Sequence, residues 1–196
     1  MKHLLITGFD PFGGETVNPS WEAVSRLPDT VGDYRLTKLQ IPTVFSLAAR
    51  TVLATAKDDI PDVILCIGQA GGRDAVTPER IAVNMASATI ADNAGTIPME
   101  EPILPGGPDG IFSTVPVARM AEAIREAGLP GKISNTAGTF VCNDTLYRLS
   151  HHFAGTGTRV GFIHVPYLPQ QAKDGAPSMT LDAIVAALTA AIEALG

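Results

Sequence analysis

The chain has 196 residues, of which 45% are hydrophobic and 17% are charged, and its formal net charge at pH 7 is −6. This length and composition suit one folded domain with a substantial core and are too apolar for disorder. The negative charge, without any lysine or arginine cluster, argues against a nucleic-acid surface, and no apolar run reaches membrane-spanning length. We therefore expect neither a nucleic-acid partner nor a membrane partner.

The cysteine content favours a reducing compartment. Only two cysteines are present, Cys66 and Cys142, and two thiols do not make a disulfide framework. Cys66 lies within a continuous apolar run, so we expect it in the core. The apolar run at residues 1–8 is too short for a secretory signal and is more typical of a first strand. These features predict a cytoplasmic protein.

Strand and helix patterns alternate along the first half of the chain. Residues 4–6 predict a short buried strand, followed by a glycine-containing loop at residues 10–14. Asn18 and Pro19 are typical of a helix N-cap and first position, so a helix is expected from there to Pro28. The next elements are a strand near a sheet edge, a helix capped by Thr43 and a central parallel strand, at residues 36–41, 44–56 and 63–67.

The second half contains one long irregular segment and several further strands and helices. Residues 92–116 hold many prolines and glycines without periodicity, which predicts a functional loop or one that contacts another subunit. A β-favouring segment begins at Ser134 and leads into a helix near Cys142. The other elements are a strand, a helix, a strand and a long helix, at residues 81–84, 117–127, 160–166 and 181–195.

This alternation of strands and helices predicts the fold class. Strands joined by helical crossovers form a mainly parallel sheet, because a parallel connection must return across one face. We expect an α/β protein with a three-layer α/β/α sandwich, formed by residues 1–196 as a single domain. The pattern does not predict the strand order.

Cys142 stands where a strand-like segment meets a helix start. Unpaired N–H groups and the helix dipole at such a position lower the pKa of a thiol and can stabilise an oxyanion. We therefore consider Cys142 a candidate nucleophile. The alternative is a small buried apolar residue, which is the usual role of a free cysteine.

Two glycine loops, at residues 8–14 and 68–73, each follow a predicted strand. We expect both loops at one edge of the sheet, where α/β proteins bind ligands. Neither loop has the spacing of a nucleotide-binding motif. Phe9 and Phe12 suit a small apolar pocket, although they could instead anchor the loop.

His164 is the histidine most suggestive of chemistry. It ends an apolar strand, whereas the helix dipole alone explains His151 and His152. Cys142, His164 as base and an acidic residue would form a triad that activates a thiol. The histidine and cysteine spacings match no metal site, so we expect no metal. Glu79 beside Arg80 is typical of a surface ion pair.

Four separated segments resemble type I pyroglutamyl peptidases, also called pyrrolidone carboxyl peptidases. These segments run in order from the N-terminus and are GFDPFGG at residues 8–14 with Asn18-Pro19-Ser20, GQAGGR at 68–73 with PERIAVN at 78–84, NTAGTFVCN at 135–143, and HVPYLP at 164–169. The resemblance implies an α/β/α cysteine peptidase that removes an N-terminal pyroglutamyl residue from small peptides. It also implies a cytoplasmic homo-oligomer, either a tetramer or a dimer, and a mechanism that needs no cofactor.

The resemblance also assigns roles to individual residues. It implies that Cys142 is the nucleophile, that His164 is the general base and then acid, and that Glu79 orients His164. The positions that would surround the lactam ring of the substrate are Phe9, Phe12, Asn18, Gln69, Phe140 and Val141.

One position departs from the family pattern. Thr89 stands where the family commonly has an arginine beside the active site, and a threonine supplies no fixed positive charge. Loss of such a group can lower a rate by orders of magnitude. The alternatives are therefore compensation by Arg73 or Arg80, or a catalytically weak homologue that binds pyroglutamyl peptides.

Overall fold

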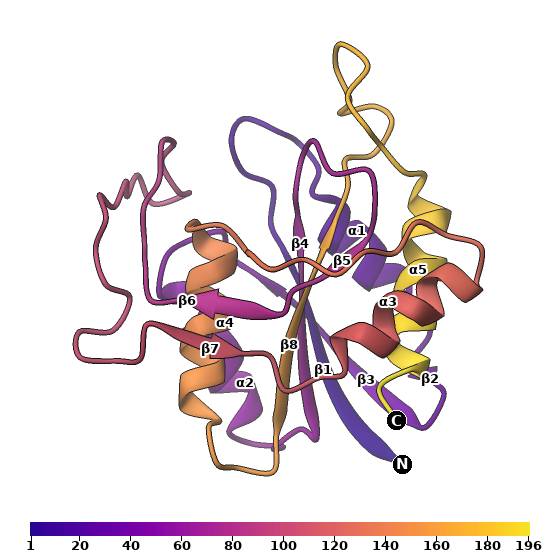
Figure 1. Ribbon diagram of the computed structural model, residues 1–196, viewed down its shortest axis with the longest axis horizontal. Helices are drawn as coiled ribbons and strands as arrows, with labels where there is room; N and C mark the ends of the chain where they lie inside the picture. The colour runs from indigo at the N-terminus through magenta and orange to yellow at the C-terminus, as the bar shows by residue number, and fades with distance from the viewer.

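The computed structural model describes residues 1–196 and contains five helices and eight strands (Figure 1). The helices are α1 (Pro19–Arg26), α2 (Leu47–Ala56), α3 (Val117–Glu126), α4 (Val141–His152) and α5 (Leu181–Glu193). The strands are β1 (Lys2–Phe9), β2 (Thr30–Val31), β3 (Tyr34–Ile41), β4 (Val63–Gln69), β5 (Thr77–Pro78), β6 (Ile81–Val83), β7 (Gly110–Phe112) and β8 (Arg159–Val165).

Six strands form one sheet in the order β2-β3-β1-β4-β8-β5. The four inner strands β3, β1, β4 and β8 are parallel, and the two-residue strands β2 and β5 pair antiparallel at the edges. The prediction of a mainly parallel sheet is confirmed. Because parallel strands point the same way, the residues that follow β1, β3, β4 and β8 all lie along one edge of the sheet.

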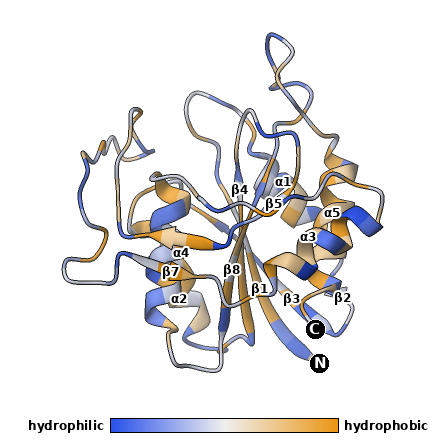
Figure 2. Cartoon of the chain, viewed as in Figure 1, coloured by the Kyte–Doolittle hydropathy of each residue, from blue (hydrophilic) through white to orange (hydrophobic).

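Helices cover both faces of this sheet, as Figure 1 shows. One buried cluster joins α1, α3 and α5 to one face, and a second joins α2 and α4 to the other. Alternate residues of β1 enter different clusters, with Leu4 and Ile6 in the first and Leu5 in the second, as the two-residue period of a strand requires. Figure 2 shows the central strands in largely hydrophobic colours. The α/β/α layering predicted from the sequence is therefore present.

Three local predictions need correction. The predicted helix at residues 44–56 begins only at Leu47, because Ser46 has a left-handed backbone with a φ of 63°. The N–H groups of Phe45 and Ser46 donate instead to the Asp92 and Asp144 carboxylates at 3.0 and 2.8 Å. Thr43 therefore caps nothing. The β-favouring segment from Ser134 to Thr139 forms no strand and makes only an isolated bridge to Glu79.

The strand predicted at residues 81–84 is present as β6, but it lies outside the main sheet. It pairs with β7, which falls inside the long loop predicted at residues 92–116. None of the helices combines the length and apolar character needed to cross a membrane.

Asn143 joins this small β6–β7 sheet to α4. Its side chain is fully buried, accepts from the Val83 N–H at 2.9 Å and donates to the Val83 and Met85 carbonyls at 2.9 and 3.0 Å. The segment after β5 is thus held against the first turn of α4 by side-chain hydrogen bonds.

We expect Asn143→Ala to lower the free energy of unfolding by about 2–3 kcal/mol, because buried backbone groups lose their partners. Urea unfolding measures this loss. Asn135→Ala is the matched control, since Asn135 is exposed and its side chain makes no hydrogen bond, and it should change the stability by less than about 0.5 kcal/mol. Equal effects of the two substitutions would contradict the anchoring role of Asn143.

Candidate active site

A cavity of about 300 Å³ lies at the carboxyl ends of the parallel strands. Its wall includes residues from the ends of β1, β4 and β8 and from the start of α4, so it occupies the edge that the two predicted glycine loops share. The residues that line it are Phe9, Phe12, Asn18, Thr43, Gln69, Ala70, Gly71, Arg73, Ala137, Gly138, Phe140, Cys142 and His164.

The sheet register brings the thiol close to the histidine. Gly68 of β4 is the register partner of His164 on β8, and parallel partners project toward the same face of a sheet. A Cβ atom built on Gly68 would lie 2.9 Å from the Cys142 Sγ atom and 2.7 Å from the Phe162 ring. Glycine at this position therefore makes room for the thiol beside His164.

Glu79 and His164 form a buried pair. Strand β5 pairs with β8 through Thr77 and His164, and the Glu79 N–H donates to the Phe162 carbonyl at 2.8 Å. This pairing places the Glu79 Oε1 atom 2.7 Å from the His164 Nδ1 atom, with Glu79 fully buried and His164 only 4% exposed. The prediction that Glu79 forms a surface ion pair with Arg80 is therefore wrong.

The surroundings fix the charges of this pair. Burial raises the pKa of Glu79, but the hydrogen bond from His164 and contributions from His164, Ser134 and Arg73 outweigh it and hold that pKa below its ordinary value. Burial lowers the pKa of His164 and prevails over the Glu79 carboxylate. At neutral pH the pair is therefore a carboxylate with a neutral imidazole whose Nδ1–H donates to Glu79, which leaves Nε2 free to accept a proton.

Cys142 is the second residue of α4, and the preceding N-cap residue, Phe140, makes no side-chain cap hydrogen bond. The first N–H groups of the helix are therefore not capped from within the chain. Burial, followed by the Glu79 charge, raises the pKa of the Cys142 thiol to about 12. Burial thus outweighs the lowering expected from the helix start, and deprotonation of the thiol requires a base.

Arg73 is a cavity residue that also contacts Glu79. Its Nη1 atom lies 2.6 Å from Glu79 Oε1 and also donates to the Thr77 hydroxyl, while Nη2 donates to the Thr136 carbonyl at 3.0 Å. Arg80, in contrast, is exposed, makes no side-chain hydrogen bond or ion pair and does not line the cavity.

Aromatic rings form the apolar wall of the cavity. The Phe12 and Phe140 ring centroids are 5.9 Å apart, and Phe45 packs edge-on against Phe140 at 5.3 Å. Phe9 is 2% exposed and packs against Phe162. Of the residues that the resemblance assigns to substrate contact, Val141 alone is absent from the cavity wall. It is the first residue of α4 and is fully buried in the core on that face of the sheet.

The two predicted polar residues, Asn18 and Gln69, are held by hydrogen bonds. The Asn18 amide donates to the Asp10 carbonyl at 2.9 Å, and its oxygen accepts from the Ser20 N–H and hydroxyl. Gln69 Oε1 accepts from the Gln171 amide at 3.1 Å. Both side chains therefore reach the cavity in fixed orientations.

Some cavity residues were not predicted from the sequence. Thr43 lines the cavity. Its N–H donates to the Asp10 carboxylate at 2.6 Å, and its hydroxyl donates to the Asp10 carbonyl at 3.1 Å. A usable signal was its position two residues after a parallel strand, at the edge where ligands bind. Ala137 and Gly138 gave no such signal, because the loop that carries them has no periodic pattern.

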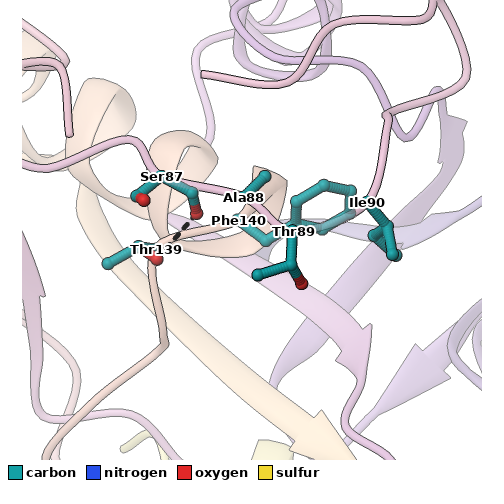
Figure 3. A pocket seen from close by; sticks show the side chains of 6 residues that line it. All are labelled: Ser87, Ala88, Thr89, Ile90, Thr139 and Phe140. Carbon is teal, nitrogen blue, oxygen red and sulfur yellow. Dashed lines mark hydrogen bonds between the residues drawn. The ribbon is translucent and has the colours of Figure 1, made fainter. Parts of the chain in front are cut away.

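Thr89 lies outside this cavity. Together with Ser87, Ala88, Ile90, Thr139 and Phe140 it lines a second cavity of about 390 Å³, and Figure 3 shows Thr89 and Ile90 beside the Phe140 ring. The Thr139 hydroxyl donates to the Ser87 carbonyl at 2.8 Å, and this hydrogen bond closes one side of the second cavity. Phe140 is the single residue common to both cavities.

No group of three or more His, Cys, Asp or Glu side chains converges in a way that could hold a metal ion. The chemically reactive groups on the cavity wall are instead a thiol and an imidazole oriented by a buried carboxylate. On an α/β sheet, this combination defines a cysteine hydrolase.

Comparison with known proteins gives the family. The pyroglutamyl peptidase family model matches residues 2–196, so the chain belongs to that family. The pyrrolidone-carboxylate peptidase of Levilactobacillus brevis is 50% identical over 98% of this chain and 96% of its own length, and that of Lactobacillus helveticus is 48% identical over 97% and 96%.

A solved structure agrees with these relatives. The crystal structure of pyroglutamyl peptidase I from Bacillus amyloliquefaciens superposes with a TM-score of 0.96 at 46% identity, over 100% of this chain and 97% of that one. Such extensive similarity to peptidases does not favour the alternative of a weak binding homologue.

Iodoacetamide should alkylate Cys142 in the native protein much faster than Cys66. Burial raises the pKa of both thiols to about 12, so the selectivity comes from access: Cys66 is fully buried, whereas Cys142 is partly exposed and lines the cavity. The rate should rise with pH because the thiolate reacts. Peptide mass spectrometry measures both sites, and equal native labelling would contradict the access argument.

Proposed function

We propose that this chain removes N-terminal pyroglutamyl residues from peptides, with Cys142 as the nucleophile, His164 as general base and then acid, and Glu79 as the group that orients His164. The observation that carries this proposal is the convergence of the thiol, the neutral imidazole and the aromatic wall on one cavity of about 300 Å³. The activity agrees with the family to which the chain belongs.

In the first half of the reaction the Cys142 sulfur attacks the pyroglutamyl carbonyl while the thiol proton passes to His164 Nε2. Glu79 stabilises the imidazolium that forms through its contact with Nδ1. The carbonyl oxygen becomes an oxyanion, and the uncapped N–H groups of the first turn of α4 stabilise it. The C–N bond then breaks, and the departing amine takes the proton from His164.

The second half of the reaction hydrolyses the resulting thioester. His164, neutral again, takes a proton from water as the water oxygen attacks the thioester carbonyl. The C–S bond breaks, pyroglutamate leaves, and His164 returns the proton to the Cys142 sulfur.

The lining of the cavity explains the choice of a lactam. Pyroglutamate is compact and neutral, and the wall offers aromatic rings from Phe9, Phe12 and Phe140 with fixed polar groups from Asn18 and Gln69. No aspartate or glutamate lines the cavity. A free N-terminal ammonium would therefore lose its hydration without gaining a counter-ion, which is costly.

We further propose that residues 1–196 work as one domain in the cytoplasm, as a homodimer or homotetramer. Two free cysteines suit a reducing compartment. Five of the eight exposed large hydrophobic residues fall between residues 85 and 112, and such a concentration favours a protein contact. Light scattering during size-exclusion chromatography tests the assembly, and a monomer at micromolar concentration would overturn this part of the proposal.

Release of aminomethylcoumarin from its pyroglutamyl derivative tests the activity directly. We expect turnover by the purified, reduced protein and a loss of at least about 1,000-fold in Cys142→Ser, because the serine hydroxyl is a far weaker nucleophile. Prolyl and alanyl derivatives serve as substrate controls. Cys66→Ser is the matched variant and should keep its turnover, since Cys66 is buried outside the cavity. A folded protein without turnover would refute the proposal.

The pH profile of kcat/KM should have its acid limb below pH 6.5. The neutral form of His164 accepts the thiol proton, and burial holds the pKa of His164 below the ordinary value of 6.5. Activity is therefore full above that pKa and falls about tenfold per pH unit below it. Stopped assays in constant ionic strength buffers measure the limb. A profile that declines between pH 7 and 8 would instead identify an imidazolium as the active form.

A further inference from the structure

Arg73 is the one side chain on the cavity wall with a permanent charge, and the mechanism above gives it no role. It ends the glycine loop that follows β4, and its side chain is 26% exposed, whereas Glu79 is fully buried. Such a half-buried guanidinium can contact both the interior and the cavity.

We propose that Arg73 is a positioning residue of this site, because it holds the Glu79 carboxylate for His164 and ties that carboxylate to the loop that leads into the Cys142 helix. The inference rests on the proposed function, since it concerns how the three reacting groups of that reaction are aligned.

The first part of the argument is the sharing of one oxygen atom. Arg73 Nη1 and His164 Nδ1 lie 2.6 and 2.7 Å from the same atom, Glu79 Oε1, while Glu79 Oε2 is buried without a hydrogen-bond partner. Two donors on one oxygen fix the rotation of the carboxylate plane. With His164 as the sole donor, the plane could turn to bring Oε2 toward Nδ1 and would carry the imidazole with it.

The second part is the link to the loop before α4. Arg73 Nη2 donates to the Thr136 carbonyl at 3.0 Å. This loop forms no strand, and Phe140 and Cys142 follow it directly. Since Nη1 holds Glu79 and Nη2 holds the loop, the rigid guanidinium plane sets the distance between the Glu79 side of the site and the segment that presents the thiol.

The third part is charge. The charged groups that act on the pKa of His164 are Glu79 before β6 and Arg73 after β4. Cys142 on α4 lines the same cavity as His164, and Cys66 of β4 acts on the Cys142 thiol. The Arg73 charge lowers the pKa of His164 and opposes the burial that raises the pKa of Cys142. Arg73 therefore favours a neutral imidazole at rest and eases proton release from His164 to the leaving amine.

The test compares Arg73→Gln and Arg73→Lys with the matched control Arg80→Gln, which removes the same charge from an exposed neighbour of Glu79. We measure the pH profile of kcat/KM and, in the free protein, the pKa of His164 by NMR of labelled imidazole. In Arg73→Gln we expect both the acid limb and the His164 pKa to move up by about one unit. We also expect kcat/KM to fall on the order of 10- to 100-fold.

Arg73→Lys separates charge from geometry. A lysine keeps the charge and loses the two-pronged contact, so its acid limb should stay near that of the wild type while kcat falls. Arg80→Gln should leave both the limb and kcat unchanged. An unshifted His164 pKa in Arg73→Gln, or an equal shift in Arg80→Gln, would overturn the proposal.

Failure of the proposed function would be distinguishable from failure of this inference. A wild-type protein without turnover on the pyroglutamyl substrate refutes the function, whereas the NMR titration needs no turnover and still reports whether Arg73 controls His164. If Arg73→Gln does not fold, the Arg73→Lys pH profile and kcat decide the question, and wild-type values for both would overturn the proposal.

Discussion

The site depends on one constraint, the burial of the Glu79 carboxylate at the edge of the sheet. A buried charge must be paired and hydrogen-bonded, because its desolvation is otherwise prohibitive. Strand β5, only two residues long, pairs with β8 and thereby places this carboxylate against His164. The burial of His164 keeps the imidazole neutral beside this carboxylate, and the burial of Cys142, to which the Glu79 charge adds, makes the thiol need a base. Packing in the two cores holds the surrounding strands and helices in place, and Glu79 and His164 are buried from water.

Much of the fold was predictable because it depends on local patterns. The continuous apolar run of residues 63–67 predicted a central strand, and Asn18 with Pro19 predicted the start of α1, whose N-cap is Asn18. The long helix predicted from residue 181 begins there, with Thr180 as its N-cap. The errors arose where distant groups compete with local preference. The helix predicted from residue 44 is interrupted by the left-handed backbone of Ser46, whose N–H and that of Phe45 bind the distant Asp144 and Asp92 carboxylates.

The residues of the site were predictable to different degrees. Cys142 and His164 stood out by their positions at a helix start and a strand end. Glu79 stood out through the family resemblance alone, since nothing local distinguishes it from a solvent-exposed glutamate. The contacts of Arg73 depend on residues up to 63 positions away, and a single sequence does not reveal which arginine meets which carboxylate. Gly68 became meaningful only when the register placed it opposite His164 and under the thiol.

The wide separation of the contributing segments along the chain has a consequence for folding. The contact between Glu79 and His164 joins residues 85 positions apart, and the bond from Ser46 to Asp144 spans 98. Loop closure over such distances is slow, and parallel strands of this kind pair late relative to local helices. We therefore expect the reactive centre to be completed among the last events of folding. Recovery of a cavity able to bind its lactam would thus report on the whole molecule, whereas helical signals would return earlier.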